Sequence, residues 1–279
     1  MPTPVQHYVK TAEDIKRILK EIDFPCVVKP SRSRLHTGTM WLRTSVRRVQ
    51  CQEDLLALIH NSEDLRYPFS IQREIIGDGY GIFCLCDHGQ RKVFFAHHRL
   101  REKPPWGGAS VLRESIPLDQ RMKEYATRLL QELDWHGVAM VEFKKDMRTG
   151  VPYLMEVNGR FWGSLQLAID AGINFPLQLV QLYKGGLPLE TCTYRVGVRS
   201  RWLLGDLDHL LTRLFSRSSS TNALPPISTV ISDFMCPHSK NTYLEVERWD
   251  DLGPCLYEMR NYIREGFGLN NSSRRRRYE

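Results

Sequence analysis

The first 75 residues alternate short apolar runs with segments of helical period. A helix-start pattern at Thr11–Asp14 precedes apolar residues at helical spacing, and Asp23-Phe-Pro25 ends that segment. Cys26–Lys29 is a short apolar run ending in a lysine, which predicts a buried strand. The other elements expected in this part are a polar loop at 31–38, a strand at 39–43, a helix at 51–59 and a strand beginning at 69–72.

Longer strand patterns follow. Runs at 80–86 and 91–101 flank Asp87-His-Gly89, whose composition is typical of a tight turn. The remaining pattern predicts a helix at 118–133, a hairpin at 137–158, a helix at 175–183, and amphipathic helices at 202–211 and 256–263. This order of elements indicates an α+β protein.

The 137–158 hairpin carries the most informative chemistry. Glu142 lies in its first apolar run and Glu156 in its second, and the midpoint between them falls in the turn 146–150. A hairpin closing there places the two glutamates roughly opposite each other, and Asn158 shares the face of Glu156 because side chains alternate. Two carboxylates and an amide are ligands that Mg²⁺ prefers, and neighbouring Arg160 suits phosphate oxygens.

Glu142 followed by Glu156-Val-Asn158-Gly-Arg160 resembles the metal-binding signature of the ATP-grasp superfamily, which includes carboxylate–amine ligases, biotin carboxylase and carbamoyl phosphate synthetase. The resemblance runs from about residue 2 to about residue 185 and is strongest at 137–176. It implies an ATP-grasp fold, in which two α+β lobes clamp a nucleotide. The expected domains are a first lobe at 1–75, a second lobe at 76–186, a C-terminal extension at 187–269 packed on the second lobe, and a disordered basic tail at 270–279.

The resemblance also assigns residues to ATP. The strand ending at Lys29 is similar to the family strand whose lysine contacts phosphates. The following loop holds one glycine where many relatives are glycine-rich, so its Arg32, Arg34 and His36 either replace backbone contacts or lie on a surface loop without a ligand.

Ile71–Gly79 resembles the hinge between the lobes, where backbone groups bind adenine and an acid holds the ribose. The residues at adenine positions are Gln72, Arg73 and Ile75. The ribose acid is either Glu74 or Asp78.

The segment 99–110 resembles the family region that faces the acceptor substrate or the γ-phosphate. Arg101 and Lys103 are expected to hold a carboxylate, and Gly107-Gly108 to offer backbone amides. His97 and His98 are expected to be structural, because adjacent strand residues point to opposite faces and cannot both line one site.

The implied activity is that of a ligase that uses ATP and Mg²⁺, or Mn²⁺, to join a small carboxylate to an amine or, less typically, a thiol. The carboxylate is activated as an acyl phosphate, Lys29 and Arg160 neutralise phosphate oxygens, and Glu142, Glu156 and Asn158 hold the metal. Relatives usually carry a preceding domain that supplies another phosphate-binding lysine. Either an upstream domain or a partner chain is therefore expected to complete the site, or the protein tolerates the loss of that lysine.

Bulk properties add limits. The chain has 279 residues and a formal net charge of +7, to which Arg274–Arg277 contribute four charges. Apolar runs are too short to cross a bilayer, and no signal-peptide pattern occurs. Seven cysteines without a C-x-x-C pair are typical of reduced thiols in a cytoplasmic protein.

Three other hypotheses stay open at this stage. One is a bicarbonate-using carboxylase or carbamoyl-phosphate-type enzyme, and another is a non-catalytic nucleotide-binding module. The third, binding of nucleic acid through the basic tail, is disfavoured because the remaining basic residues are scattered.

Overall fold

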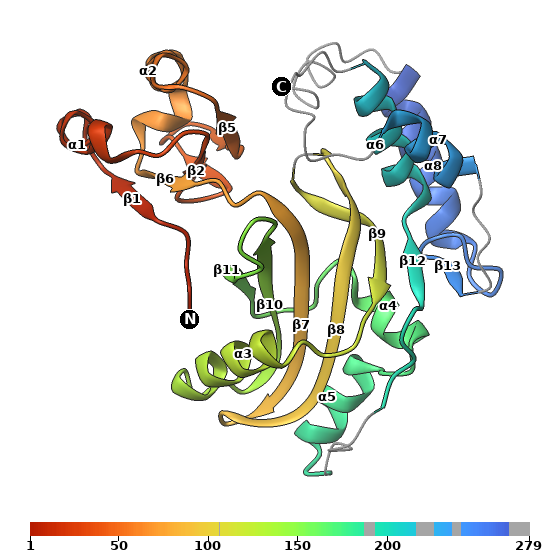
Figure 1. Ribbon diagram of the computed structural model, residues 1–279. Coiled ribbons are helices and arrows are strands. Elements are labelled where there is room, and N and C mark those ends of the chain that lie inside the picture. Colours follow the sequence, from red (N-terminus) through yellow and green to blue (C-terminus); the bar gives the residue numbers. More distant parts are fainter. Residues whose placement is uncertain (106, 187–192, 216–225, 236–240, 268–279) are drawn as a thin grey trace. The chain divides into compact units, whose positions relative to one another are not determined.

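The computed structural model describes residues 1–105, 107–186, 193–215, 226–235 and 241–267 (Figure 1). The basic tail expected at 270–279 lies outside these residues. The chain divides into two compact units, Met1–Ile76 and Gly77–Glu279, and the division falls within the 71–79 segment. Among the described residues, no helix has both the length and the apolar character that a bilayer crossing requires.

The first unit is built on a four-stranded sheet in the order β1-β6-β2-β5. Its strands are β1 (Gln6–Val9), β2 (Cys26–Pro30), β5 (Arg47–Val49) and β6 (Phe69–Arg73). Helices α1 (Ala12–Ile18) and α2 (Gln52–Asn61) and the 3₁₀ turns η1 (Leu19–Glu21) and η2 (Glu63–Arg66) complete it. The core contains Ile15, Val28, Leu55 and Ile71, so both helices bury their apolar faces against the sheet.

One sequence expectation in this unit is wrong. The polar loop expected at 31–38 contains β3 (Arg34–His36), which pairs with β4 (Trp41–Arg43) as a separate two-stranded ribbon. Leu35 is buried between exposed Arg34 and His36, so the strand has the alternation of period two, but only one apolar residue reveals it. The turn is closed by Thr37, whose backbone N–H donates to the Met40 carbonyl at 2.9 Å.

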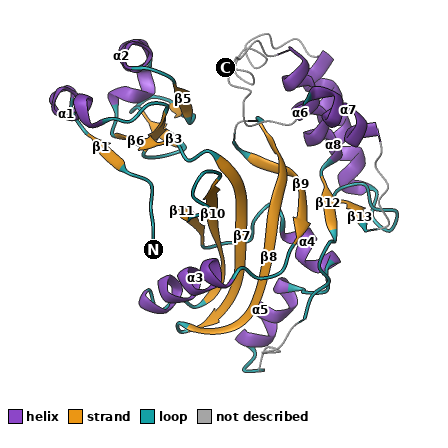
Figure 2. Ribbon diagram, in the orientation of Figure 1, coloured by secondary structure: helices purple, strands orange, loops and turns teal. Residues whose placement is uncertain are grey.

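The second unit contains a seven-stranded sheet in the order β11-β10-β7-β8-β9-β12-β13. Its long central strands, drawn side by side in Figure 2, are β7 (Gly77–Asp87), β8 (Gln90–Lys103) and β10 (Gly137–Asp146). The others are β9 (Ala109–Ser115), β11 (Pro152–Asn158), β12 (Arg199–Arg201) and β13 (Thr242–Leu244). All pairs are antiparallel except β12 with β13.

Helices cover both faces of this sheet. On one face, α3 (Gln120–Glu132) packs Met122, Ala126 and Leu130 against β7 and β10. On the other face, α4 (Leu165–Asp170) and α5 (Phe175–Tyr183) close a core that includes Phe83 and Phe95. The last part of the chain extends the same unit with β12, β13 and the helices α6 (Leu203–Phe215), α7 (Ile227–Met235) and α8 (Gly253–Phe267).

Candidate functional site

A row of residues on five strands of the second sheet points to one face. Directly opposed residues in an antiparallel sheet share a face. The register pairs Ser115 with His97, His97 with Gly81, Gly81 with Glu142, and Glu142 with Glu156. The row crosses from β9 to β11 and confirms that the two glutamates face each other.

Glu142 and Glu156 share one amide donor. The Asn158 Nδ2 group donates to Glu142 Oε1 at 3.0 Å and to Glu156 Oε1 at 2.8 Å. Glu142 is buried, whereas Glu156 is exposed. The register shifts directly after Glu142, so the β10–β11 ladder contains a bulge beside this cluster. Bulges re-aim neighbouring side chains and are common next to active sites.

This donor set fits a hard divalent cation. Burial raises the pKa of the Glu142 carboxyl, Arg99 lowers it and Glu156 raises it again, with a net rise. Two carboxylates that repel each other in this way are stabilised by a shared cation. Turning the Asn158 amide presents its oxygen in place of its nitrogen, which completes an all-oxygen set of the kind that Mg²⁺ prefers.

Arg99 on β8 reaches Glu142 on β10 because β7, which lies between them, carries glycine where the side chain passes. Arg99 forms an ion pair with Glu142. A methyl group at Gly79 would lie 2.9 Å from Arg99 Cδ, and one at Gly81 would lie 2.5 Å from His97 Nε2. The two glycines thus leave room for the arginine and the histidine over the sheet. Burial opposes the charge of Arg99, but nearby carboxylates raise its pKa overall.

His97 and Arg113 add two buried groups to this face. Both His97 ring nitrogens are buried without a hydrogen-bond partner among the described residues. Burial, Arg99 and Arg113 hold the pKa of His97 well below its ordinary value, so the imidazole is neutral. Burial also lowers the pKa of Arg113, although its ion-pair partner Glu245 opposes this change. The pKa of Glu245 is raised by its own burial.

The end of the hairpin motif has a packing reason for its glycine. A methyl group at Gly159 would lie 2.4 Å from the Trp135 ring, whose Nε1 donates to the Val138 carbonyl at 3.2 Å. Arg160 is exposed, and its Nη1 donates to the Phe161 carbonyl at 2.9 Å. The assignment of Arg160 to phosphate stays a prediction.

The nucleotide residues predicted in the first unit lie on adjacent strands or directly after them. Glu74 accepts a hydrogen bond from Arg48 Nε at 2.6 Å, so this candidate ribose acid already has a cationic partner. The structure places these residues in β2, in β6 or just after β6: Lys29, Gln72, Arg73, Glu74 and Ile75. Gln72 and Ile75 are buried.

The other candidate ribose acid, Asp78, belongs to the second unit. Its Oδ2 lies 3.3 Å from His98 Nε2, and the interaction with His98 lowers the pKa of the carboxyl. The His98 ring stacks on Tyr80 with a centroid distance of 4.6 Å. His97 and His98 therefore point to opposite faces, as expected, but His97 belongs to the face that carries Glu142.

Arg101 and Lys103 have carboxylate partners inside the protein. Arg101 donates two hydrogen bonds of 2.7 Å to Asp206, and Lys103 forms an ion pair with Asp208. The register pairs Arg99 with Arg113 but Arg101 with Leu112, so a bulge turns Arg101 to the opposite face from Arg99. Both residues are better explained as anchors of α6 than as ligands for a substrate carboxylate.

The predicted Gly107-Gly108 pair lies in the loop between β8 and β9. Gly107 has φ 137°, and a methyl group at Gly108 would lie 2.3 Å from the Lys103 carbonyl oxygen. Both glycines are required by the backbone of this loop. Their role as amide donors to a ligand stays a prediction.

Sequence reasoning missed Arg99, Arg113 and Glu245. Period two along β8 groups Arg99 with His97, but only the pairing of β8 with β7, and of β7 with β10, shows that this face carries Glu142. Glu245 directly follows β13, in a part of the chain where the sequence shows no recognisable motif. A local signal for Arg99 existed in Gly79 opposite it and in Gly81 opposite His97, because glycines are unusual in a central strand.

Comparisons with known proteins found ATP-grasp proteins. A family model described as "ATP-grasp in the biosynthetic pathway with Ter operon" matches residues 68–204. The D-alanine–D-alanine ligase of Thermoanaerobacter sp. (strain X514) is 29% identical over 172 residues, covering 57% of this chain and 46% of the ligase. The chain thus spans about half the length of the curated relatives it matches.

Solved structures share the fold at lower identity. The L-amino acid ligase from Bacillus licheniformis matches with a TM-score of 0.50 and 24% identity, covering 65% of this chain and 43% of the ligase. The biotin carboxylase domain of the Hydrogenobacter thermophilus 2-oxoglutarate carboxylase, solved with MgADP, ADP and bicarbonate, matches with a TM-score of 0.55 and 18% identity. That match covers 71% of this chain and 46% of the domain. The chain has the ATP-grasp fold, and its residues 68–204 are similar to an ATP-grasp family.

Proposed function

We propose that this chain is the ATP-binding part of a carboxylate–amine ligase that depends on ATP and Mg²⁺. The observation that carries the proposal is the opposition of Glu142 and Glu156, with Asn158 contacting both and Arg99 reaching Glu142. The similarity to a D-alanine–D-alanine ligase supports a carboxylate and an amine as the substrates.

In the proposed reaction, a substrate carboxylate oxygen attacks the γ-phosphorus of ATP and ADP leaves. The amine then attacks the acyl carbon, phosphate leaves and the amine loses a proton. Mg²⁺ held by Glu142, Glu156 and Asn158 would offset the charge of the phosphate oxygens. Arg99 and Arg113 hold positive charge on the same face, where developing negative charge is stabilised by fixed donors.

The remaining residue assignments rest on the family resemblance. Lys29 and Arg160 neutralise phosphate oxygens, Gln72, Arg73 and Ile75 contact adenine, and Glu74 or Asp78 holds the ribose. Because of their ion pairs with α6, Arg101 and Lys103 are left out of the acceptor site.

Thermal unfolding with and without ATP and Mg²⁺ tests the proposal. At about 100 times its dissociation constant, a ligand stabilises the folded state by roughly 2.7 kcal/mol. We expect the wild type to gain this stability only when Mg²⁺ is present, and Glu156→Gln to lose the gain. Glu156 is exposed, so this variant should fold. The matched control is Glu132→Gln, because Glu132 is exposed on α3, which covers the other face of the sheet.

A coupled assay for ADP release then examines the reaction. ADP formation that requires both a carboxylate and an amine supports the ligase. ADP formation that requires bicarbonate instead would assign the chain to the carboxylases. Equal stabilisation of wild type and Glu156→Gln by ATP and Mg²⁺ would contradict the metal site itself.

A further inference from the structure

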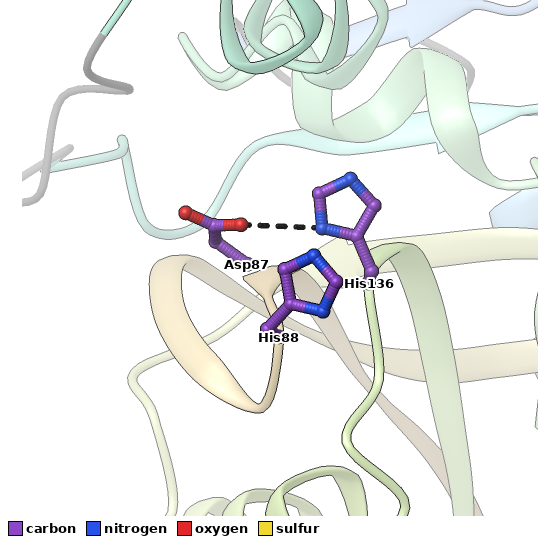
Figure 3. A group of neighbouring side chains, drawn as sticks. All are labelled: Asp87, His88 and His136. Carbon is purple, nitrogen blue, oxygen red and sulfur yellow. Dashed lines mark ion pairs between the residues drawn. The ribbon is translucent and has the colours of Figure 1, made fainter. Parts of the chain in front are cut away.

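Three metal-ligating side chains meet at one end of the second sheet, away from the glutamate pair. Asp87 ends β7, His88 lies in the β7–β8 turn, and His136 directly precedes β10 (Figure 3). One ligand atom from each lies within 4.8 Å of the others. Asp87 Oδ1 is 3.2 Å from His136 Nδ1, and the two imidazole rings stack with centroids 4.5 Å apart.

The backbone that carries these side chains is tightly held. Asp87 pairs with Gln90 across a two-residue turn, in which His88 has φ 44° and Gly89 φ 70°. The Gly89 N–H donates to the Trp135 carbonyl at 2.9 Å, and Gly137 pairs with Cys86. The β7–β8 and β7–β10 pairings and the hydrogen bond of Gly89 therefore hold the three side chains on neighbouring backbone segments.

The separation of the Asp87 and His136 ligand atoms matches a tetrahedral transition-metal site. Two ligand atoms that lie 2.0–2.1 Å from one Zn²⁺ at a tetrahedral angle are about 3.4 Å apart, close to the separation of the Asp87 and His136 atoms. His88 is exposed and can turn toward the same point. A water would supply the fourth position, since Asp134 contacts only His88 of the three ligands, at 3.6 Å from its Nδ1.

We propose that Asp87, His88 and His136 form a surface site for Zn²⁺ or a similar divalent transition-metal ion. Two imidazoles select such ions over Mg²⁺, which prefers oxygen ligands. A bound ion would link the β7–β8 turn to the start of β10 through its ligands. Asp87 lies six positions along β7 from Gly81, the partner of Glu142, so the site lies about 20 Å from the glutamate pair. The site is therefore separate from the glutamate pair.

Calorimetric titration of the metal-free, tag-free chain with Zn²⁺ tests this site. We expect one saturable site in the wild type, and at least about a 100-fold loss of affinity in His136→Ala and Asp87→Asn, because each removes a direct ligand. His88→Asn removes the imidazole but keeps a residue that tolerates positive φ. The control is His60→Ala, since His60 is exposed on α2, in the other unit.

A second readout follows the ion itself. Co²⁺ bound to the wild type should give the visible absorption of a four-coordinate site, and Zn²⁺ should displace it. Glu156→Gln should bind Zn²⁺ as the wild type does, which separates this site from the proposed nucleotide site. A wild type without a saturable Zn²⁺ site, or His136→Ala and Asp87→Asn that bind as tightly as the wild type, would overturn the proposal.

Discussion

At the scale of single residues, the candidate site depends on what is absent as much as on what is present. Gly79 and Gly81 carry no side chains on the central strand β7, so Arg99 and His97 occupy the space above it. Arg99 then balances the negative charge of Glu142 in a buried ion pair. A buried pair of this kind is costly to break, because the remaining charge lacks compensation. The glycines therefore help to set the charge state of the glutamate.

Burial on this face makes His97 a source of pH dependence in the free energy of unfolding. Its pKa in the folded state lies well below the ordinary value of 6.5, so below pH 6.5 the unfolded chain binds a proton that the folded chain does not. The free energy of unfolding therefore falls as the pH falls from 6.5, by up to about 1.4 kcal/mol per pH unit from this group. His209, whose pKa burial also lowers, adds to the effect, while buried glutamates with raised pKa act in the opposite sense.

Comparing variants isolates the contribution of His97. Urea unfolding of His97→Gln between about pH 5 and pH 6.5 should show a shallower loss of stability than the wild type, by up to about 1.4 kcal/mol per pH unit. His60→Gln, at an exposed position, should keep the wild-type slope. Identical slopes in His97→Gln and the wild type would show that His97 is not held neutral.

At the scale of elements, the sequence predicted features that depend on one local segment, and it missed features that depend on the pairing of several strands. The β10–β11 hairpin followed from alternation and a turn composition within about 20 residues, and so did the opposition of Glu142 and Glu156. Short strands such as β3 and β12 were missed, because three residues show too little periodicity. The position of Arg99 required the register of three strands, and a bulge turns Arg101 to the face opposite that of Arg99.

The anchoring of α6 makes a prediction at this scale. Asp206 accepts hydrogen bonds from Arg101 and from Arg201 Nε at 2.7 Å, and all three side chains are buried. Asp206→Asn would remove the carboxylate shared by two buried guanidiniums and leave Arg101 only the largely exposed Asp233, so the free energy of unfolding should fall by roughly 3–5 kcal/mol in urea titrations.

A matched control exists on the same arginine. Asp233 lies 3.7 Å from Arg101 Nη1, but its side chain is 60% exposed. Asp233→Asn should therefore change stability by less than about 1 kcal/mol. Equal losses in the two variants would argue against the buried pair as the anchor of α6.

At the scale of the whole molecule, separate hydrophobic cores stabilise the two units of the chain. The first unit has one core, which includes Leu55. The second has a core on each face of its sheet, and Leu85 belongs to one of them. Within each unit, strands far apart in the sequence pair with one another, so each unit gains stability only when its own sheet is complete.

Hydrogen exchange can therefore distinguish the units. Leu55 and Leu85 are both fully buried, and replacing either by alanine should cost about 2–5 kcal/mol. In exchange followed by mass spectrometry, Leu55→Ala should accelerate exchange in 1–76 and leave the strands of 77–279 protected, whereas Leu85→Ala should do the reverse. Since the two substitutions remove the same atoms, each serves as the control for the other. Acceleration throughout the chain in both variants would mean that the two units unfold as one, because the loss of one core would then deprive both of their protection.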